Sequence, residues 1–194
     1  MPLRQHVYSA LILSSSDRFD EQILQLLDRS VFSPVCFEKS VGGAQRRTAE
    51  RSFDIVLINS PLPDDFGARF AIDISAKNTT VVMMFVKSEV YGGVYDKVSD
   101  YGVFTLKKPM SSQSVIQALD FLKATRERLR RMEKKSLSLQ DKMEEIKIVN
   151  HAKWVLIKAL NMNEEDAHKY IEKQAMDRCV SKREIAESII STYK

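Results

Sequence analysis

The carboxyl-terminal residues 110–194 contain neither glycine nor proline, and this feature constrains the chain more than any other. Gly102 is the last glycine and Pro109 is the last proline. Because these two residue types are the strongest interruptions of regular structure, a stretch of this length without them is predicted to be almost entirely helical. The segment from Ser111 to the carboxyl terminus is therefore the framework around which the rest of the chain is organised.

Apolar or small residues recur every seven positions within this helical stretch. They form two sets, Leu122, Leu129, Ser136, Met143 and Asn150, and Thr125, Met132, Leu139 and Ile146. A seam of this kind, kept for about four heptads, is typical of a coiled coil. A buried asparagine such as Asn150 favours a two-stranded state in one register. We therefore expect a homodimer through a coiled-coil linker at residues 123–147, the alternative being one amphipathic helix packed on its own domain.

Composition places the chain among ordinary globular proteins. Of its 194 residues, 44% are hydrophobic and 29% are charged, and no apolar run reaches the length of about 18 residues that suggests a membrane span. Met1–His6 lacks the apolar segment of a secretory signal. Cys36 and Cys179 are too far apart to suggest a disulfide framework or a metal site. We expect a cytoplasmic protein without a metal ion or another cofactor.

Positive charge is concentrated in the second half of the chain. Residues 123–194 carry 17 lysines and arginines against 12 acidic residues, whereas residues 1–122 carry 13 against 14. A basic carboxyl-terminal half favours a polyanionic partner, although the excess is mild.

Short apolar runs alternate with amphipathic segments in the first 110 residues. The runs predicted as strands are Tyr8–Leu13, Val35–Phe37, Asp54–Asn59, Thr80–Val86 and Val103–Leu106. Five successive strand–helix units predict an α/β fold with a flavodoxin-like, doubly wound parallel sheet of strand order 2-1-3-4-5. Functional residues in such a sheet lie at the carboxyl ends of the strands.

Two motifs at these strand ends resemble the receiver domain of two-component response regulators. The run Asp54–Pro63, followed by Gly67, has the receiver's order of strand, acceptor position, proline and glycine. The run Leu106–Pro109 matches the receiver's Lys-Pro signature, with Lys108 as its characteristic lysine. The resemblance begins near residue 7, implies a (βα)5 fold, and leads us to assign residues 1–122 to a receiver-like domain.

Three features of the chemistry expected of a receiver are missing. Asn59 stands where the resemblance implies the aspartate that accepts a phosphoryl group, and an amide is not a nucleophile for that transfer. Ser14, Ser15 and Ser16 occupy the segment where an acidic pair would hold Mg²⁺, which prefers carboxylates. Phe85 replaces the hydroxyl residue after the fourth strand. We therefore expect a pseudo-receiver in which Lys108 hydrogen-bonds to Asn59 or to a backbone carbonyl.

A domain of this kind could still bind a regulatory protein. The segment from Phe85 to Phe104 corresponds to the interaction face of receivers and carries Tyr91, Tyr95, Tyr101 and Phe104. Aromatic residues are enriched at interfaces, although these four could equally be core or ordinary surface.

The last part of the chain is predicted to form a three-helix bundle. The long helix should end near Asn161, because asparagine tolerates the left-handed conformation that ends helices. Asn163 and Ser181 are predicted to cap two further helices, each followed three residues later by an acidic residue.

This bundle resembles the ANTAR domain, an RNA-binding output module of transcription antitermination regulators. The matching positions are Ile148, Ala152, Lys153, Leu156, the turn at residues 161–167, Ala175, Met176, Ile185–Glu187, Ile189 and Ile190. The resemblance covers about residues 140–194, and we assign residues 148–194 to an ANTAR RNA-binding domain. It departs from the family at Trp154 and Asn161, where glycine is usual.

The resemblance implies contacts between basic residues and RNA. The candidates are Lys153, Trp154, Lys173, Arg178, Lys182 and Arg183. Lys153 and Lys182 are the strongest of them, and each candidate could instead be a solvated surface charge. Trp154 is expected to fill the bundle core beside Val155 and Leu156, with stacking on an RNA base as the alternative.

These observations predict a non-enzymatic regulator that binds hairpins in nascent transcripts as a homodimer and prevents a terminator from forming. One alternative is a DNA-binding regulator, although residues 184–193 lack the Arg, Asn or Gln side chains that read bases. The other is a two-component regulator phosphorylated at a relocated acceptor, Asp64 or Asp65, both of which lie beyond Pro63.

Overall fold

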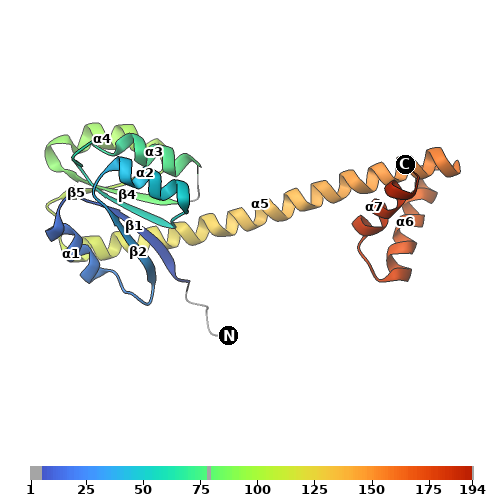
Figure 1. Ribbon diagram of the computed structural model, residues 1–194, viewed down its shortest axis with the longest axis horizontal. Helices are drawn as coiled ribbons and strands as arrows, with labels where there is room; N and C mark the ends of the chain where they lie inside the picture. Colours follow the sequence, from blue (N-terminus) through green and yellow to red (C-terminus); the bar gives the residue numbers. More distant parts are fainter. Residues whose placement is uncertain (1–5, 78–79, 194) are drawn as a thin grey trace. The chain divides into compact units, whose positions relative to one another are not determined.

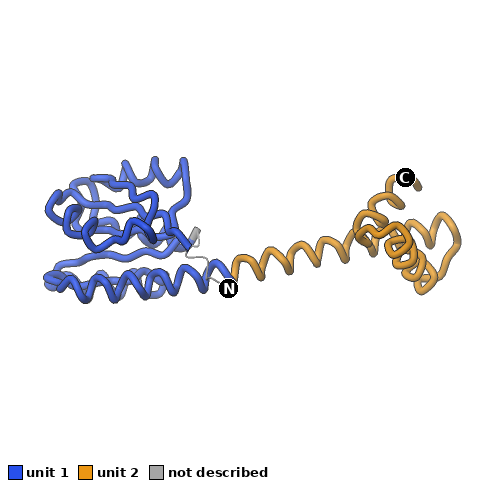
Figure 2. The backbone as a smooth tube through the Cα atoms, turned by 90° about the horizontal axis from the view of Figure 1, so that it is seen from below, with its two compact units in different colours: residues 1–131 blue, residues 132–194 orange. Residues whose placement is uncertain are grey.

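The computed structural model describes residues 6–77 and 80–193. The chain divides into two compact units, residues 1–131 and residues 132–194 (Figure 2). The expectation that the chain begins without a secretory signal concerns mainly residues 1–5, which lie outside the described residues. Each unit has its own apolar core, so we describe each by itself.

A five-stranded sheet forms the centre of the first unit (Figure 1). Its strands are β1 (Tyr8–Leu13), β2 (Phe32–Glu38), β3 (Ile55–Asn59), β4 (Val81–Lys87) and β5 (Phe104–Lys108). Their order is β2-β1-β3-β4-β5 and every pairing is parallel. The predicted fold class and strand order are therefore confirmed. Strand β2 is longer than the apolar run at Val35–Phe37 because it is an edge strand with several exposed residues.

Helices cover both faces of this sheet (Figure 1). One face is covered by α2 (Val41–Glu50), α3 (Ala68–Lys77) and α4 (Tyr91–Val98), and the other by α1 (Asp17–Leu26) and the first part of α5 (Ser112–Leu160). Two single 3-10 turns, η1 (Ser88–Val90) and η2 (Ser99–Tyr101), flank α4. Because side chains alternate along each strand, the sheet contributes to both cores.

Helix α5 has 49 residues, as the absence of glycine and proline predicted. Two residues of the predicted seam pack within the first unit: Leu122 is fully buried, and Leu129 lies against the same core. For this part of the helix, the alternative of packing on its own domain therefore holds. Further along α5, Met132 and Met143 remain 58% and 60% exposed.

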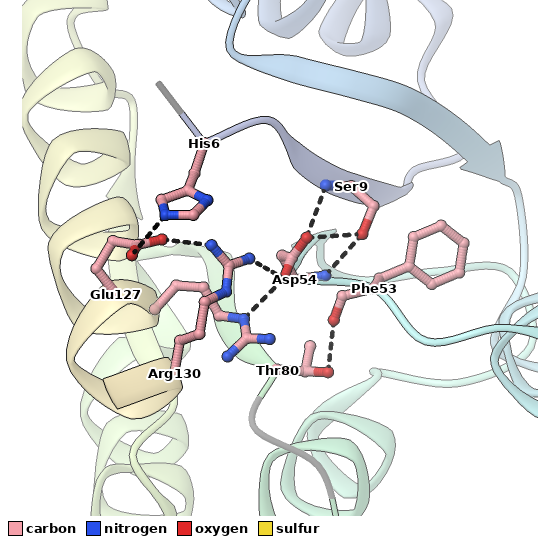
Figure 3. Close-up of polar contacts among 8 residues, drawn as sticks. His6, Ser9, Phe53, Asp54, Thr80, Glu127 and Arg130 are labelled. Carbon is pink, nitrogen blue, oxygen red and sulfur yellow. Dashed lines mark hydrogen bonds and ion pairs between the residues drawn. The ribbon is translucent and has the colours of Figure 1, made fainter. Parts of the chain in front are cut away.

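A cluster of ion pairs fastens α5 to the sheet near the amino-terminal end of β3 (Figure 3). Asp54, just before β3, accepts hydrogen bonds from Arg126 Nε at 2.8 Å and from Arg130 Nη2 at 3.1 Å. It also accepts bonds from the Ser9 backbone N–H at 2.9 Å and the Ser9 hydroxyl at 3.0 Å. Glu127 binds Arg130 at 2.6 Å. Burial acts to raise the pKa of Asp54, but the bonds from Ser9 and Arg126 outweigh it and lower that pKa.

The second unit contains the end of α5 together with α6 (Glu164–Arg178) and α7 (Lys182–Thr192). Helix α5 ends at Leu160, and Asn161 adopts a left-handed φ of 56°. The Asn163 side chain accepts the Asp166 N–H, and the Ser181 side chain accepts the Glu184 N–H. The predicted helix end and both predicted caps are therefore confirmed. The buried core of this bundle is Ala152, Leu156, Ala167, Ile171, Ala175, Ile185, Ala186 and Ile189.

Two further properties concern the part of the chain that the structure describes. Within it, no helix is both long enough and apolar enough to cross a membrane. Nor do three or more His, Cys, Asp or Glu side chains gather there in a way that could hold a metal ion.

Candidate nucleic-acid interface and strand-end pocket

A hydrogen-bonded chain of neutral groups and one lysine occupies the carboxyl ends of β1, β3 and β5. The Lys108 ammonium donates to Asn59 Oδ1 at 2.8 Å and to the Ser60 carbonyl at 2.6 Å. The Asn59 amide donates to the Ser14 hydroxyl at 3.1 Å. Asn59 is only 8% exposed, and Ser14 only 2%. Burial lowers the pKa of Lys108, and the nearby Lys87 ammonium adds to that effect.

Phe85 lies in register with Asn59 on the neighbouring strand. Its ring is fully buried and meets the Phe19 ring edge-on, with ring centroids 5.0 Å apart. An aromatic ring therefore takes up the position beside Asn59 and offers no hydroxyl there. Ser15, the other serine expected near this pocket, is exposed.

The carboxylates near this pocket do not fit a magnesium site. Asp17 is exposed and pairs with Lys39 at 2.9 Å. Asp20 has one buried carboxylate oxygen with no hydrogen-bond partner, and burial raises its pKa, although nearby Ser14 opposes that shift. A single carboxylate cannot replace the set of charged oxygen ligands that Mg²⁺ requires. We therefore derive no chemistry that uses a metal ion here.

The two aspartates considered as relocated acceptors, Asp64 and Asp65, both accept hydrogen bonds from backbone N–H groups. Asp64 accepts the N–H groups of Val41 and Gly42, each at 3.0 Å, at the start of α2. These two bonds lower the pKa of Asp64. Asp65 accepts the Gly67 N–H at 2.6 Å. Both carboxylates therefore have a structural role in the loop after β3.

Aromatic side chains gather around α4 and β5. The Tyr91 and Tyr95 rings stack with centroids 5.8 Å apart, and the Lys107 ammonium lies 4.4 Å from the Tyr91 centroid. Tyr95, Tyr101 and Phe104 are 47%, 52% and 38% exposed. This surface thus presents partly exposed rings with a cation beside them.

The two strongest RNA-binding candidates line one hollow in the second unit, and both are paired with acidic residues. The hollow measures about 430 Å³, and Lys153 from α5 and Lys182 from α7 both contribute to its lining. Lys153 contacts Glu164 at 2.9 Å, and Lys182 contacts Glu172. These contacts lower the pKa of both glutamates. The structure therefore brings the two lysines together but partly neutralises them.

The other basic candidates lie apart from this hollow. Arg183 contacts Glu187 at 2.9 Å and Glu144 at 3.6 Å. Lys173 and Arg178 are exposed on α6, and neither belongs to the lining described for the hollow. Of the basic candidates, only Lys153 and Lys182 therefore share the lining of the hollow.

Trp154 does not fill the bundle core. Its side chain is 63% exposed, so the expectation that it would be buried is wrong. Leu156 faces the core and is fully buried. Residues two apart on a helix differ by about 200° in direction, so Trp154 points away from the core that Leu156 enters. It lies eleven positions, about three turns, after Met143 and on the same side of α5.

Sequence reasoning did not predict where several residues of these sites lie. Asn150 and His168 line the same hollow as Lys153, and the Asp54 cluster fastens α5. The spacing of Arg126 and Arg130 by one helical turn was the only signal for that cluster, and it did not reveal which acid they would meet. Nothing in the sequence predicted that His168 would approach the hollow.

Comparison with known proteins gave a match to a protein family and a related regulatory protein. Residues 137–190 match the family model of the ANTAR domain. The transcriptional regulatory protein PdtaR of Mycobacterium tuberculosis is 26% identical over 140 residues, which span 72% of this chain and 68% of that protein.

Solved structures resemble the first unit. The signal receiver domain of an HD domain-containing protein from Pseudomonas fluorescens is 19% identical. Its alignment covers 68% of this chain and 96% of that domain, with a TM-score of 0.58. A response regulator receiver domain from Clostridium thermocellum is 16% identical. Its alignment covers 65% of this chain and 99% of that domain, with a TM-score of 0.55. At these identities, the likeness shows the fold alone.

Proposed function

The chain is an ANTAR-domain response regulator with a receiver-like amino-terminal domain, and we propose that it controls transcription by binding RNA hairpins in nascent transcripts. It acts as a homodimer, without enzymatic activity, and prevents a terminator from forming. Its receiver-like domain does not accept a phosphoryl group, so its input comes from a partner protein, a ligand or its own abundance.

The observation that carries the RNA-binding proposal is the position of the ANTAR match. It covers residues 137–190, which include the hollow lined by Lys153 and Lys182. Basic groups engage phosphates while unpaired loop bases are read by stacking and by edge hydrogen bonds. The excess of positive charge in residues 123–194 supports the same kind of partner.

The proposal that phosphorylation is absent rests on the strand-end pocket. Asn59 is an amide held between Lys108 and Ser14, and Phe85 fills the space beside it. The two alternative acceptors, Asp64 and Asp65, already hold backbone N–H groups. A partner protein could bind the aromatic surface formed by Tyr91, Tyr95, Tyr101 and Phe104.

The proposed dimer uses the part of the seam that its own domain leaves exposed. Met132, Leu139, Met143 and Ile146 follow one another along α5 at spacings of seven, four and three and are between 53% and 60% exposed. A second copy of this helix would bury them. Two ANTAR domains would then bind two hairpins of one transcript more tightly than either alone, through raised effective concentration.

The test is a gel-shift titration at roughly 100–200 mM salt. An RNA with two hairpins should bind more tightly than duplex DNA of matched length, and its affinity should fall as salt rises. Lys153→Ala and Lys182→Ala should each weaken RNA binding by roughly 10-fold or more if they contact phosphates. Equal affinity for RNA and DNA would favour the DNA-binding alternative instead.

A further inference from the structure

The hollow in the second unit has more than lysines in its wall. Helix α5 contributes Ile146 and Val149 as an apolar wall, with Asn150 beside them. Helix α6 contributes His168. The volume of the hollow, about 430 Å³, falls within the range of roughly 300–1,000 Å³ that is usual for small-molecule sites. The hollow therefore combines apolar surface with an amide and an imidazole in one place.

These groups match the parts of a nucleotide. An apolar wall can cover the face of a base, and an asparagine amide offers both a donor and an acceptor to a base edge. A neutral imidazole also offers one donor and one acceptor. Three lysines at the same hollow, Lys142, Lys153 and Lys182, can reach phosphates on either side of that base.

We infer that this hollow takes one unpaired base of an RNA loop, with Asn150 and His168 at the base edge and the lysines on the flanking phosphates. The inference rests on the proposed RNA-binding function and names the part of the RNA that the domain recognises. Lys142, Asn150 and His168 were not among the residues expected to contact RNA, so they carry the new part of the assignment.

The charges around the hollow suit a ligand that replaces existing ion pairs. Of its lining residues, Glu145 is acidic, and Glu164 and Glu172 pair with two of its three lysines. His168 Nε2 also lies 3.3 Å from Glu172. The three carboxylates balance the three lysines, so a free anion gains little there. A nucleotide within an RNA strand adds base contacts to the phosphate contacts, and the hollow has an amide and an imidazole for the base and lysines for the phosphates.

The hollow overlaps the end of the predicted seam. Ile146 and Asn150 belong to both, whereas Met132, Leu139 and Met143 of the seam do not line the hollow. Lys142 and Val149 lie roughly 100° or more from Met143 around α5, as their positions along the helix require. The same two residues are about 40° and 60° from Ile146, so a second copy on the seam would border the hollow.

The experiment uses the full chain and a hairpin RNA selected for binding from a pool with randomised loop sequences. Each loop base of the selected hairpin is replaced in turn by an abasic site. One abasic position should weaken binding to the wild-type protein by roughly 10-fold, the size expected for a stacked and hydrogen-bonded base. The Asn150→Ala and His168→Ala double variant should bind the intact hairpin more weakly and be indifferent to that abasic position.

A matched pair of lysine variants separates the hollow from general charge. Lys142→Ala and Lys147→Ala each remove one exposed charge from α5, but only Lys142 lines the hollow. Lys142→Ala should weaken hairpin binding several-fold more than Lys147→Ala. Circular dichroism should show unchanged helix content for all three variants, because the altered residues are exposed, and light scattering should show the wild-type oligomeric state for the two lysine variants.

The outcomes distinguish this inference from the proposed function. If no hairpin is enriched from the pool, the RNA-binding function itself fails. If a hairpin binds the wild type tightly but the double variant still loses affinity at the same abasic position, the base lies elsewhere and the hollow is not its site. Equal effects of Lys142→Ala and Lys147→Ala would overturn the phosphate part of the inference. A free ribonucleoside monophosphate that bound more tightly than the hairpin would also overturn it.

Discussion

Lys108 donates a hydrogen bond to Asn59 Oδ1 at 2.8 Å, so the lysine of β5 is joined directly to the amide at the end of β3. Its other acceptor is the Ser60 carbonyl, which is also neutral. The half-buried ammonium therefore has hydrogen bonds but no carboxylate among these partners, and burial lowers its pKa. The pocket links three strands through Lys108, Asn59 and Ser14, and none of these residues has a carboxylate that could accept a phosphoryl group.

The first prediction is that acetyl phosphate with Mg²⁺ leaves the intact mass of the protein unchanged. Asn59 has no carboxylate to form an acyl phosphate, and the neighbouring Ser14 and Asp20 do not form a magnesium site. The Asn59→Asp variant should also stay unmodified, because the metal ligands would still be missing. A base-labile phosphoryl adduct on the wild-type chain, located by peptide mass spectrometry, would reject the pseudo-receiver.

The second prediction concerns the stability of the same pocket. Lys108→Met should lower the free energy of unfolding by about 1–3 kcal/mol, since the Asn59 oxygen and the Ser60 carbonyl would each lose a donor in a buried site. Urea unfolding measures the change. Lys97→Met is the matched control, because Lys97 is exposed on α4 and a surface substitution should stay within about 0.5 kcal/mol. Similar values for both variants would mean that the pocket contributes nothing to stability.

The third prediction concerns acid stability and the Asp54 cluster. Asp54→Asn should lower the free energy of unfolding at neutral pH by on the order of 3 kcal/mol, because Arg126 and Arg130 would lose their shared carboxylate in a mostly buried site. The pKa of Asp54 is lower in the folded chain than its ordinary value of 3.8. The native state therefore binds fewer protons there, and this contribution is present above 3.8 and is lost as pH falls through the folded pKa.

Urea unfolding between about pH 7 and about pH 3 would test whether the stability that Asp54 contributes is lost as the pH falls. The difference between the wild type and Asp54→Asn should shrink at the acid end of this range. Asp96→Asn is the control, because Asp96 is exposed on α4. A difference that stays constant down to the lowest pH would show that the Asp54 carboxylate is not what stabilises the junction between β3 and α5.

Sequence reasoning succeeded where a local cause determines the structure. The strands follow from apolar runs bounded by polar turns, and the end of α5 follows from an asparagine that accepts a left-handed φ. The caps at Asn163 and Ser181 depend on residues three positions apart, so they are readable without tertiary information.

It failed where the outcome depends on a partner from a distant segment. The heptad pattern places Leu122 and Leu129 on one face of α5, but only the folded sheet shows that its own core covers them. Likewise, Lys153 and Lys182 are basic in sequence, whereas their pairing with Glu164 and Glu172 depends on how three helices pack. Trp154 was misplaced because its apolar neighbours suggested crowding, although helical geometry directs it away from the side that Leu156 occupies.

The fourth prediction tests the dimer seam with a control on the same helix. Replacing Leu139 and Met143 by lysine should convert a dimer into monomers, because two charges would enter the apolar stripe. Leu137→Lys is the control: Leu137 is 60% exposed, as Met143 is, but it lies about 120° away around the helix. Light scattering should give twice the monomer mass for the wild type and for Leu137→Lys. A dimeric Leu139 and Met143 double variant would show that the interface lies elsewhere.

The last prediction concerns Glu172, whose carboxylate holds both Lys182 and His168 at the edge of the hollow. The Lys182 ammonium keeps the pKa of Glu172 below its usual value, so this carboxylate is ionised at neutral pH and competes with any phosphate for Lys182. Glu172→Gln should therefore raise the affinity for hairpin RNA by roughly two- to fivefold, the range of a weak surface ion pair.

The control for this variant is Glu165→Gln, which removes one negative charge from the same helix. Glu165 pairs with Lys169 at 2.6 Å, and neither residue lines the hollow. Both variants reduce long-range repulsion of RNA equally, so any extra gain for Glu172→Gln measures the release of Lys182 and His168. Gel-shift titrations at one salt concentration give the comparison. Equal gains would mean that Lys182 does not contact the RNA, and a loss for Glu172→Gln would mean that the glutamate itself holds the lysine in its binding position.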